Sequence, residues 1–143
     1  MLTQLRSLVA VWGKASRGYS VSMTRERLRR GAIGEELAAA FVRARGFLIV
    51  ERNFRCSAGE IDLIALDDAT VVFCEVRTRR SAAQGGALES VTAMKQRQVV
   101  RVASVFLARH RLHAHPVRFD VVAVELRLPL VTIEHIADAF RAE

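Results

Sequence analysis

Two apolar periodicities alternate along the chain, one of about 3.6 residues and one of two, and this predicts an α/β domain. Helical spacing governs residues 31–45, and Gly46 would end that helix. The apolar stripe of this helix would consist of Ile33, Leu37, Ala40, Phe41 and Ala44. A second helix is expected from Thr92, a typical N-cap residue, to about Arg109.

Strands are expected where short runs are rich in β-branched and aromatic side chains. They are predicted at 47–54, 59–64, 71–77 and 117–126, followed by a short strand at 130–133 and a last helical turn or two over 136–141. A loop covers Ser81–Gly86. The order is therefore α-β-β-β-α-β with a small C-terminal appendage, which predicts a mixed sheet flanked by helices.

The second and third strands flank a polar turn and should form an antiparallel hairpin. A turn of two or of four residues pairs positions whose numbers sum to 137, which puts Asp62 directly opposite Glu75. The same register puts Glu60 opposite Arg77, and all four side chains are expected on one face. Two facing carboxylates destabilise a sheet unless a cation lies between them, either a divalent metal or a basic side chain.

Further polar residues interrupt apolar patterns. Lys95 shares a helical stripe with Val99, Val102, Ala103 and Phe106. Because unpaired buried lysine is rare, Lys95 should face the carboxylates or extend to an edge. Asp120 is expected to balance Arg118 on its strand. The spacing of His110, His113 and His115 favours a helix end and loop over a zinc site.

The formal net charge of +7 favours an anionic partner such as nucleic acid. Residues 1–30 hold seven basic residues and one acidic residue, so most of the excess lies outside the fold. Inside the fold, residues 31–76 hold four basic and eight acidic residues, whereas residues 77–111 hold eight and one. An acidic cluster beside a basic one suits a metal site next to a phosphate-binding surface, and the alternative is ordinary charge scatter across solvated faces.

The chain is expected to form one domain over residues 26–143, preceded by a basic segment at 1–25. That segment is interpreted as a disordered tail, a transit-like segment or an upstream extension of a reading frame that begins at Met23. No apolar run has the length of a membrane span, which predicts a soluble cytoplasmic protein without membrane contact. Two cysteines, Cys56 and Cys74, predict reduced thiols and not a disulfide.

Several motifs occur in an order that resembles a known family. They are Gly34-Glu35, Leu37-Ala38, Gly46-Phe47, Arg52-Asn53, Gly59-Glu60-Ile61-Asp62-Leu63-Ile64, Phe73, Glu75-Val76-Arg77, Gly85, Lys95 and Arg118-Phe119-Asp120-Val121-Val122. From about residue 28 to residue 140, the chain is similar to the YraN-like family of uncharacterised bacterial proteins, which is distantly similar to archaeal Holliday-junction resolvases. The resemblance implies a restriction-endonuclease-like fold of the PD-(D/E)XK type.

The same resemblance implies roles for individual residues. A Mg²⁺ or Mn²⁺ ion would be held by Asp62, Glu75, the carbonyl of Val76 and Glu35. The residues implied in catalysis are Asp62, Glu75, Arg77 and Lys95. The expected nucleic-acid contacts are Arg79, Arg80, Arg97 and Arg101. Arg77 departs from the Lys of the nuclease motif, because a guanidinium can stabilise phosphate charge but cannot serve as a base.

The position of Glu35 conflicts with the predicted helix stripe. On a helical wheel Glu36 borders the stripe of large apolar residues, whereas Glu35 falls with Ala38, Ala39 and Val42. That second set could itself lie against the sheet. We follow the resemblance and expect Glu35 at the site.

Two classes of function are open. One is a metal-dependent endonuclease that hydrolyses phosphodiesters in branched or single-stranded nucleic acid. The other is a catalytically inactive module of the same fold that binds nucleic acid or a protein partner. In that case Arg77 or Lys95 would neutralise the carboxylate pair as a buried ion network. The oligomeric state is open, with a homodimer among the options.

Overall fold

The structure of the protein, a computed structural model, describes residues 25–80, 86–127 and 129–142. Its elements, in chain order, are α2 (Arg25–Ala44), β1 (Leu48–Cys56), β2 (Gly59–Asp67), β3 (Thr70–Arg79), α3 (Ala93–His110), β4 (Val117–Arg127) and β5 (Leu130–Phe140). Almost all of the predicted basic segment 1–25 lies outside the described residues, as does most of the predicted loop Ser81–Gly86.

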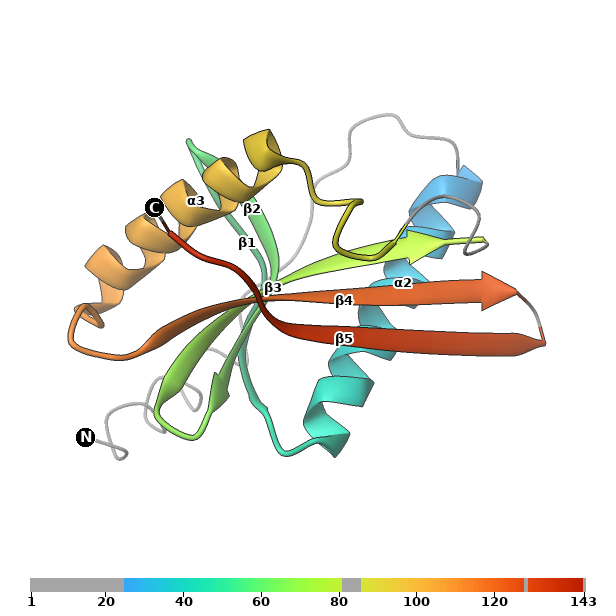
Figure 1. The fold of residues 1–143 in the computed structure, drawn as a ribbon, viewed down its shortest axis with the longest axis horizontal. Coiled ribbons are helices and arrows are strands. Elements are labelled where there is room, and N and C mark those ends of the chain that lie inside the picture. Colours follow the sequence, from blue (N-terminus) through green and yellow to red (C-terminus); the bar gives the residue numbers. More distant parts are fainter. Residues whose placement is uncertain (1–24, 81–85, 128, 143) are drawn as a thin grey trace.

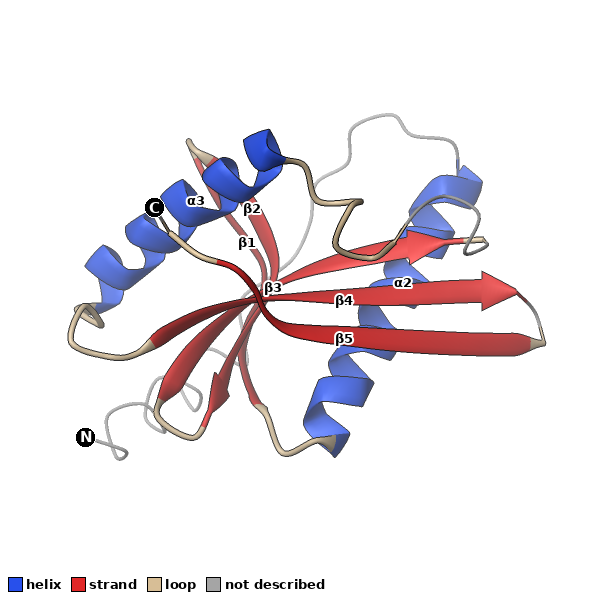
Figure 2. Cartoon of the chain, in the orientation of Figure 1, coloured by secondary structure: helices blue, strands red, loops and turns tan. Residues whose placement is uncertain are grey.

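The strands form one mixed sheet in the order β1-β2-β3-β4-β5 (Figure 1). Strands β3 and β4 are parallel, and every other neighbouring pair is antiparallel. The chain between the two parallel strands contains α3, as a parallel connection requires. The predicted α-β-β-β-α-β core with a mixed sheet is therefore confirmed, and a fifth strand follows it (Figure 2).

A hydrophobic core fills each side of the sheet. In β3, Val71 and Phe73 contribute to the core beneath α3, whereas Val72 and Cys74 contribute to the core beneath α2. This alternation is the two-residue period of a strand that is buried on both faces. Cys74 is a free thiol and points away from the face of its neighbour Glu75, as predicted.

The apolar stripe predicted for the first helix is wrong. The buried positions of α2 are the small residues Gly34, Ala38, Ala39 and Val42. Ile33, from the predicted stripe, is 50% exposed. The helix lies so close to β3 that a Cβ atom at Gly34 would come within 3.0 Å of the Thr78 Cβ atom. Small residues therefore form the contact face, and larger apolar residues lie at its margins.

The C-terminal appendage also differs from the prediction. The short strand at 130–133 and the helical turns at 136–141 are replaced by the single strand β5, which pairs with β4 along its length. The spacing of Ile136 and Phe140 suits a helix, but pairing with a buried strand outweighs local propensity. A bulge at Asp138, with φ at 51°, absorbs the mismatch in register.

Gly34→Ala should destabilise the protein by about 1–3 kcal/mol, because the added methyl group would be forced against the whole Thr78 side chain. Urea unfolding measures the loss. Gly31→Ala is the matched control in the same helix, since a Cβ atom there meets nothing within 4 Å. It should raise stability by about 0.5–1 kcal/mol. Equal effects of the two substitutions would contradict the close approach of α2 to β3.

Candidate functional site

The hairpin of β2 and β3 has the predicted register. Its paired positions, such as Leu63 and Cys74, sum to 137 around a two-residue turn. Asp68 in that turn has φ at 51°, as the common two-residue hairpin turns require. The backbone pairing ends at Leu63, so Asp62 and Glu75 are the next two positions along the hairpin.

Beyond this last pair, β2 and β3 separate. The Asp62 Oδ2 atom accepts a hydrogen bond from the backbone N–H of Val76 at 2.8 Å. Figure 1 shows β1 and β2 turning away from β3, β4 and β5. A carboxylate thus takes the place of a backbone carbonyl where the ladder would have continued, and it lies in the gap between the two strands.

Glu75 is buried beside two cations. It is 4% exposed, and its Oε1 atom lies 3.4 Å from Lys95 Nζ and 3.6 Å from Arg77 Nη2. Its Oε2 atom is buried and has no hydrogen-bond partner among the described residues. The prediction that Lys95 faces the carboxylates is confirmed. One carboxylate oxygen of the pair nevertheless has nothing to accept from, which is costly for a buried anion.

The surroundings of Asp62 and Glu75 disfavour the charged form of both carboxyl groups. Burial, and then the negative charge of Glu75, raise the pKa of Asp62 to about 8. Burial also raises the pKa of Glu75, in spite of the opposing effect of Lys95 and Arg77. The two basic side chains therefore do not fully compensate the pair, and both carboxyl groups retain their protons to higher pH than usual.

Glu35 and not Glu36 is oriented toward the pair. The Glu35 side chain is hydrogen-bonded to Asn53 of β1, and its negative charge contributes to the raised pKa of Asp62. Glu36 is exposed and pairs with Arg52 at 2.8 Å. The small-residue face of α2 explains this orientation, because Glu35 lies beside that face on the helical wheel.

The predicted partner of Glu60 is wrong. Its Oε2 atom accepts from Arg55 Nε at 2.9 Å, across the β1–β2 ladder and not from Arg77. The reason is the separation of the strands: β2 continues to pair with β1 as far as Gly59, whereas its pairing with β3 stops at Leu63. Arg77 therefore lies beside Glu75 of its own strand.

Comparison with known proteins identifies the family. Residues 34–124 match "Uncharacterised protein family UPF0102". A UPF0102 protein of Geotalea uraniireducens is 50% identical over 111 residues, covering 77% of this chain and 87% of the relative. One of Roseiflexus castenholzii is 47% identical over 117 residues, covering 80% and 94%.

This chain belongs to the UPF0102 family. The family assignment confirms the resemblance drawn from the motifs. The UPF0102 match extends from Gly34 in α2 to Val124 in β4 and includes every predicted site residue. Neither α2 nor α3, the described helices, is long and apolar enough to cross a membrane.

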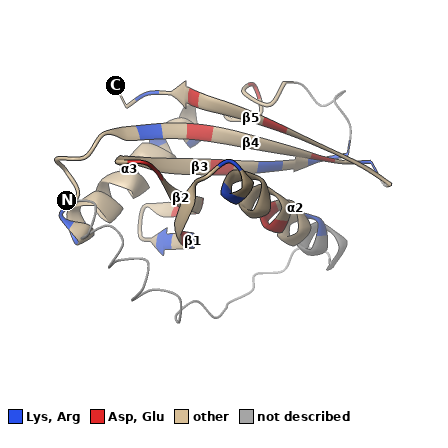
Figure 3. Cartoon of the chain, turned by 90° about the horizontal axis from the view of Figure 1, so that it is seen from below, with Lys and Arg blue, Asp and Glu red and all other residues tan. Residues whose placement is uncertain are grey.

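The predicted phosphate contacts of this UPF0102 protein lie on α3 and around the end of β3. Arg97 and Arg101 are exposed on α3, but at 100° per residue they lie about 200° and 240° around the helix from Lys95. Arg79 pairs with Glu134 of β5 at 3.5 Å. Arg80 is exposed in a bend directly after the end of β3. Basic and acidic positions are interspersed along the strands and α2 (Figure 3).

A second acidic cluster in the UPF0102 domain is fully paired. Buried Asp120 accepts from Arg118 at 2.8 and 2.9 Å and from the Asp138 N–H at 3.0 Å, and it lies 2.8 Å from His135 Nε2. Although burial opposes them, the bonds to His135 and Arg118 hold the pKa of Asp120 below its usual value. The predicted balance of Asp120 by Arg118 is confirmed, and this cluster fastens the bulge of β5 to β4.

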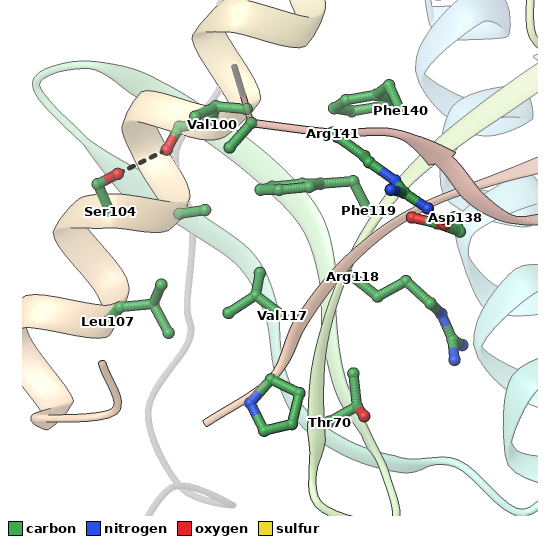
Figure 4. Close-up of a pocket in the computed structure, with 13 residues that line it drawn as sticks. Thr70, Val100, Ser104, Leu107, Val117, Arg118, Phe119, Asp138, Phe140 and Arg141 are labelled. Carbon is green, nitrogen blue, oxygen red and sulfur yellow. Dashed lines mark hydrogen bonds and ion pairs between the residues drawn. The ribbon is translucent and has the colours of Figure 1, made fainter. Parts of the chain in front are cut away.

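A pocket of about 680 Å³ lies between α3, the start of β4 and the end of β5 (Figure 4). Its walls are mostly apolar, and its charged residues are Arg118, Asp138 and Arg141. Arg118 is held by Asp120, and Arg141 pairs with Asp138 at 2.9 Å. None of the predicted site residues lines this pocket. Its charged side chains are paired with one another or with Asp120, whereas the carboxylate pair of Asp62 and Glu75 is not fully compensated.

Two features of the site were not predicted. The first is the hydrogen bond from the Val76 N–H to Asp62, because strand separation leaves no trace in a hydrophobic pattern. The second is Asn53, which the Arg52-Asn53 motif contained but to which no role was given. The carbonyl of Val76 as a ligand stays a prediction.

Replacing Asp62 by Asn should change how stability depends on pH in chelator-treated protein. The folded-state pKa of about 8 exceeds the ordinary Asp value of about 4, so native protein retains a proton that unfolded chain has released. Wild-type stability should therefore fall as pH rises through this window, and Asp62→Asn should make that fall smaller, leaving the part contributed by other carboxyl groups with raised pKa values such as Glu75. Urea unfolding at several pH values measures it, with Asp68→Asn at the exposed turn as the control. Parallel wild-type and Asp62→Asn profiles would contradict the raised pKa.

Proposed function

We propose that this UPF0102 protein is a metal-dependent nuclease that hydrolyses phosphodiesters in branched or single-stranded nucleic acid. The observation that carries the proposal is the undercompensated pair of Asp62 and Glu75 beside Lys95 and Arg77. A pair built only for structure would be fully neutralised by its neighbours, because uncompensated buried charge destabilises a fold.

The chemistry of the pair fits a hard divalent cation. Mg²⁺ is usually bound through one or two carboxylates with water and substrate oxygens, and it does not need an all-protein cage. In the described residues no three His, Cys, Asp or Glu side chains converge as a metal-binding group, in keeping with such an open site. The free Oε2 atom of Glu75 is a ready oxygen donor. When bound, the cation would supply Lewis-acid activation of the phosphate and the attacking water.

Lys95 and Arg77 would act on the phosphate from the protein side. Both lie within 4 Å of the Glu75 carboxylate, so a phosphate bridging to a cation there would be within reach of both. Arg77 cannot accept a proton, and its role would be to stabilise negative charge in the transition state. Any proton transfer to a side chain would have to involve Lys95 or a carboxylate.

The second candidate is a binding module without catalysis. It is favoured by the ion pairs that Lys95 and Arg77 already make with Glu75 and by the arginine at the position of the motif lysine. In this case the carboxylates would hold the two basic side chains in place for a nucleic acid or a protein partner, and no cation would be needed.

Isothermal titration with Mn²⁺ and cleavage assays on junction, flap and single-stranded DNA test the first candidate. Wild type should bind Mn²⁺, and Asp62→Ala should abolish that binding. Arg77→Ala should lower cleavage about a hundredfold, as removal of a transition-state donor typically does, whereas Arg77→Lys should keep or raise it. If wild type binds these DNAs but no variant cleaves them with Mg²⁺ or Mn²⁺, the binding-module function replaces the nuclease.

A salt titration tests the predicted role of α3 in binding phosphates. If Arg97 and Arg101 meet phosphates, replacing both with Ala should weaken binding to all sequences. The slope of log affinity against log salt should fall by about one for each phosphate that is no longer neutralised. Arg43→Ala with Arg45→Ala is the matched control, because it removes two exposed charges from the last turn of α2 and the turn that follows it, on the other face of the sheet. Equal decreases in affinity from both pairs would indicate general electrostatic attraction and not an interface on α3.

A further inference from the structure

Asn53 has an unusual backbone conformation for its place in the sheet. Four non-glycine residues among those described have positive φ. Asp68 lies in a turn, Arg111 caps α3 and Asp138 lies in a bulge. Asn53, with φ at 53°, lies inside β1, where the ladder to β2 keeps one register on both sides of it. Asparagine tolerates this conformation better than most residues, but a strand does not ordinarily require it.

The consequence is that the paired strands β1 and β2 exchange faces at this point. Residues two apart in a strand normally share a face. Here Arg52 contacts Glu36 of α2, whereas Phe54 packs in the core beneath α3. Across the ladder, Leu63 packs beneath α2 and Ile61 beneath α3. Both strands thus reverse their faces between the same two ladder positions.

Asn53 and Asp62 occupy that reversal together. The register of β1 and β2 places them directly across from each other, between the pairs Arg52–Leu63 and Phe54–Ile61. With the strand faces exchanging here, Asp62 is free to extend into the gap toward the Val76 N–H. On the other side, the Asn53 side chain bonds to Glu35 of α2.

We propose that Asn53 is a positioning residue of the metal site, one that turns Asp62 into the gap through its backbone and orients the Glu35 carboxylate toward the same site through its amide. The proposal rests on the proposed function, since it concerns the same cation. This role explains why Asn53 has a left-handed backbone conformation inside a regular ladder. The packing of β1 alone does not require that conformation.

The backbone and amide contributions can be separated. Asn53→Gly keeps the left-handed conformation accessible and removes only the amide. It should leave the thermal midpoint of chelator-treated protein unchanged or higher, and weaken Mn²⁺ binding about tenfold or more, as loss of an outer-sphere partner typically does. Asp68→Gly is the matched control, because it makes a similar substitution at a positive φ far from the site. It should leave the Mn²⁺ dissociation constant unchanged.

A double-mutant cycle tests whether Asn53 acts through Glu35. Glu35→Gln should weaken Mn²⁺ binding, and adding Asn53→Gly should weaken it no further. Unchanged Mn²⁺ affinity in Asn53→Gly, or effects of the two substitutions that add in full, would overturn the role of the Asn53 amide in positioning Glu35 and leave the proposed function intact. Failure of wild type to bind Mn²⁺ at all would overturn the metal site and the role of Asn53 with it.

Discussion

The hydrogen bond from the Val76 N–H to the Asp62 carboxylate is the interaction on which this site depends. A sheet whose central strands part must satisfy the backbone groups it leaves unpaired, or forfeit their hydrogen-bond energy. Here an acidic side chain accepts the first of them. Because the Asp62 carboxylate accepts this hydrogen bond in place of a backbone carbonyl, its side chain lies in the plane of the sheet, toward Glu75 on the neighbouring strand. A helix from each layer then contributes to one site, with Glu35 from α2 and Lys95 from α3. The separation of β2 and β3 costs the sheet backbone hydrogen bonds, and it also leaves the space between the strands in which the Asp62 carboxylate lies.

The charge balance bears on the choice between an enzyme and a binding module. Lys95 and Arg77 both contact one oxygen of Glu75, and the other oxygen is left without a partner among the described residues. If the two cations had been placed to neutralise the pair, they would be expected to divide between the two carboxylates. With both cations on one oxygen, burial still raises the pKa of Asp62 and of Glu75, so these carboxylates hold a proton where a cation could replace it. That asymmetry is better suited to a cation on the carboxylate side and an anionic phosphate on the basic side than to a closed ion network.

The sequence pattern was sufficient to predict those features of the structure that depend on residues close together in the chain. The hairpin register follows from a two-residue period and a turn, and the direction of Lys95 follows from its place in a helical stripe. The face of α2 was not predictable in this way, because close packing selects small residues such as Ala38 over the more hydrophobic Ile33. The strand β5 was missed because its pairing with buried β4 is decided by a segment distant in sequence. Periodicity records neither the separation of β2 and β3, which decides the partner of Glu60, nor the backbone conformation of Asn53.

The two buried acidic clusters of this fold differ physically in how completely their carboxylates are provided with donors. Asp120 has donors from a guanidinium, an imidazole neighbour and a backbone N–H, and its pKa is lowered although it is fully buried. Asp62 has one backbone donor and a second carboxylate nearby, and its pKa is raised. Burial penalises both carboxylates, so the difference lies in how many donors the surrounding elements provide. The fold supplies a full set of donors to Asp120 near the start of β4. The carboxylates at the gap between β2 and β3 have an incomplete set. The missing positive charge is what an incoming cation would provide, and it distinguishes the gap from the Asp120 cluster.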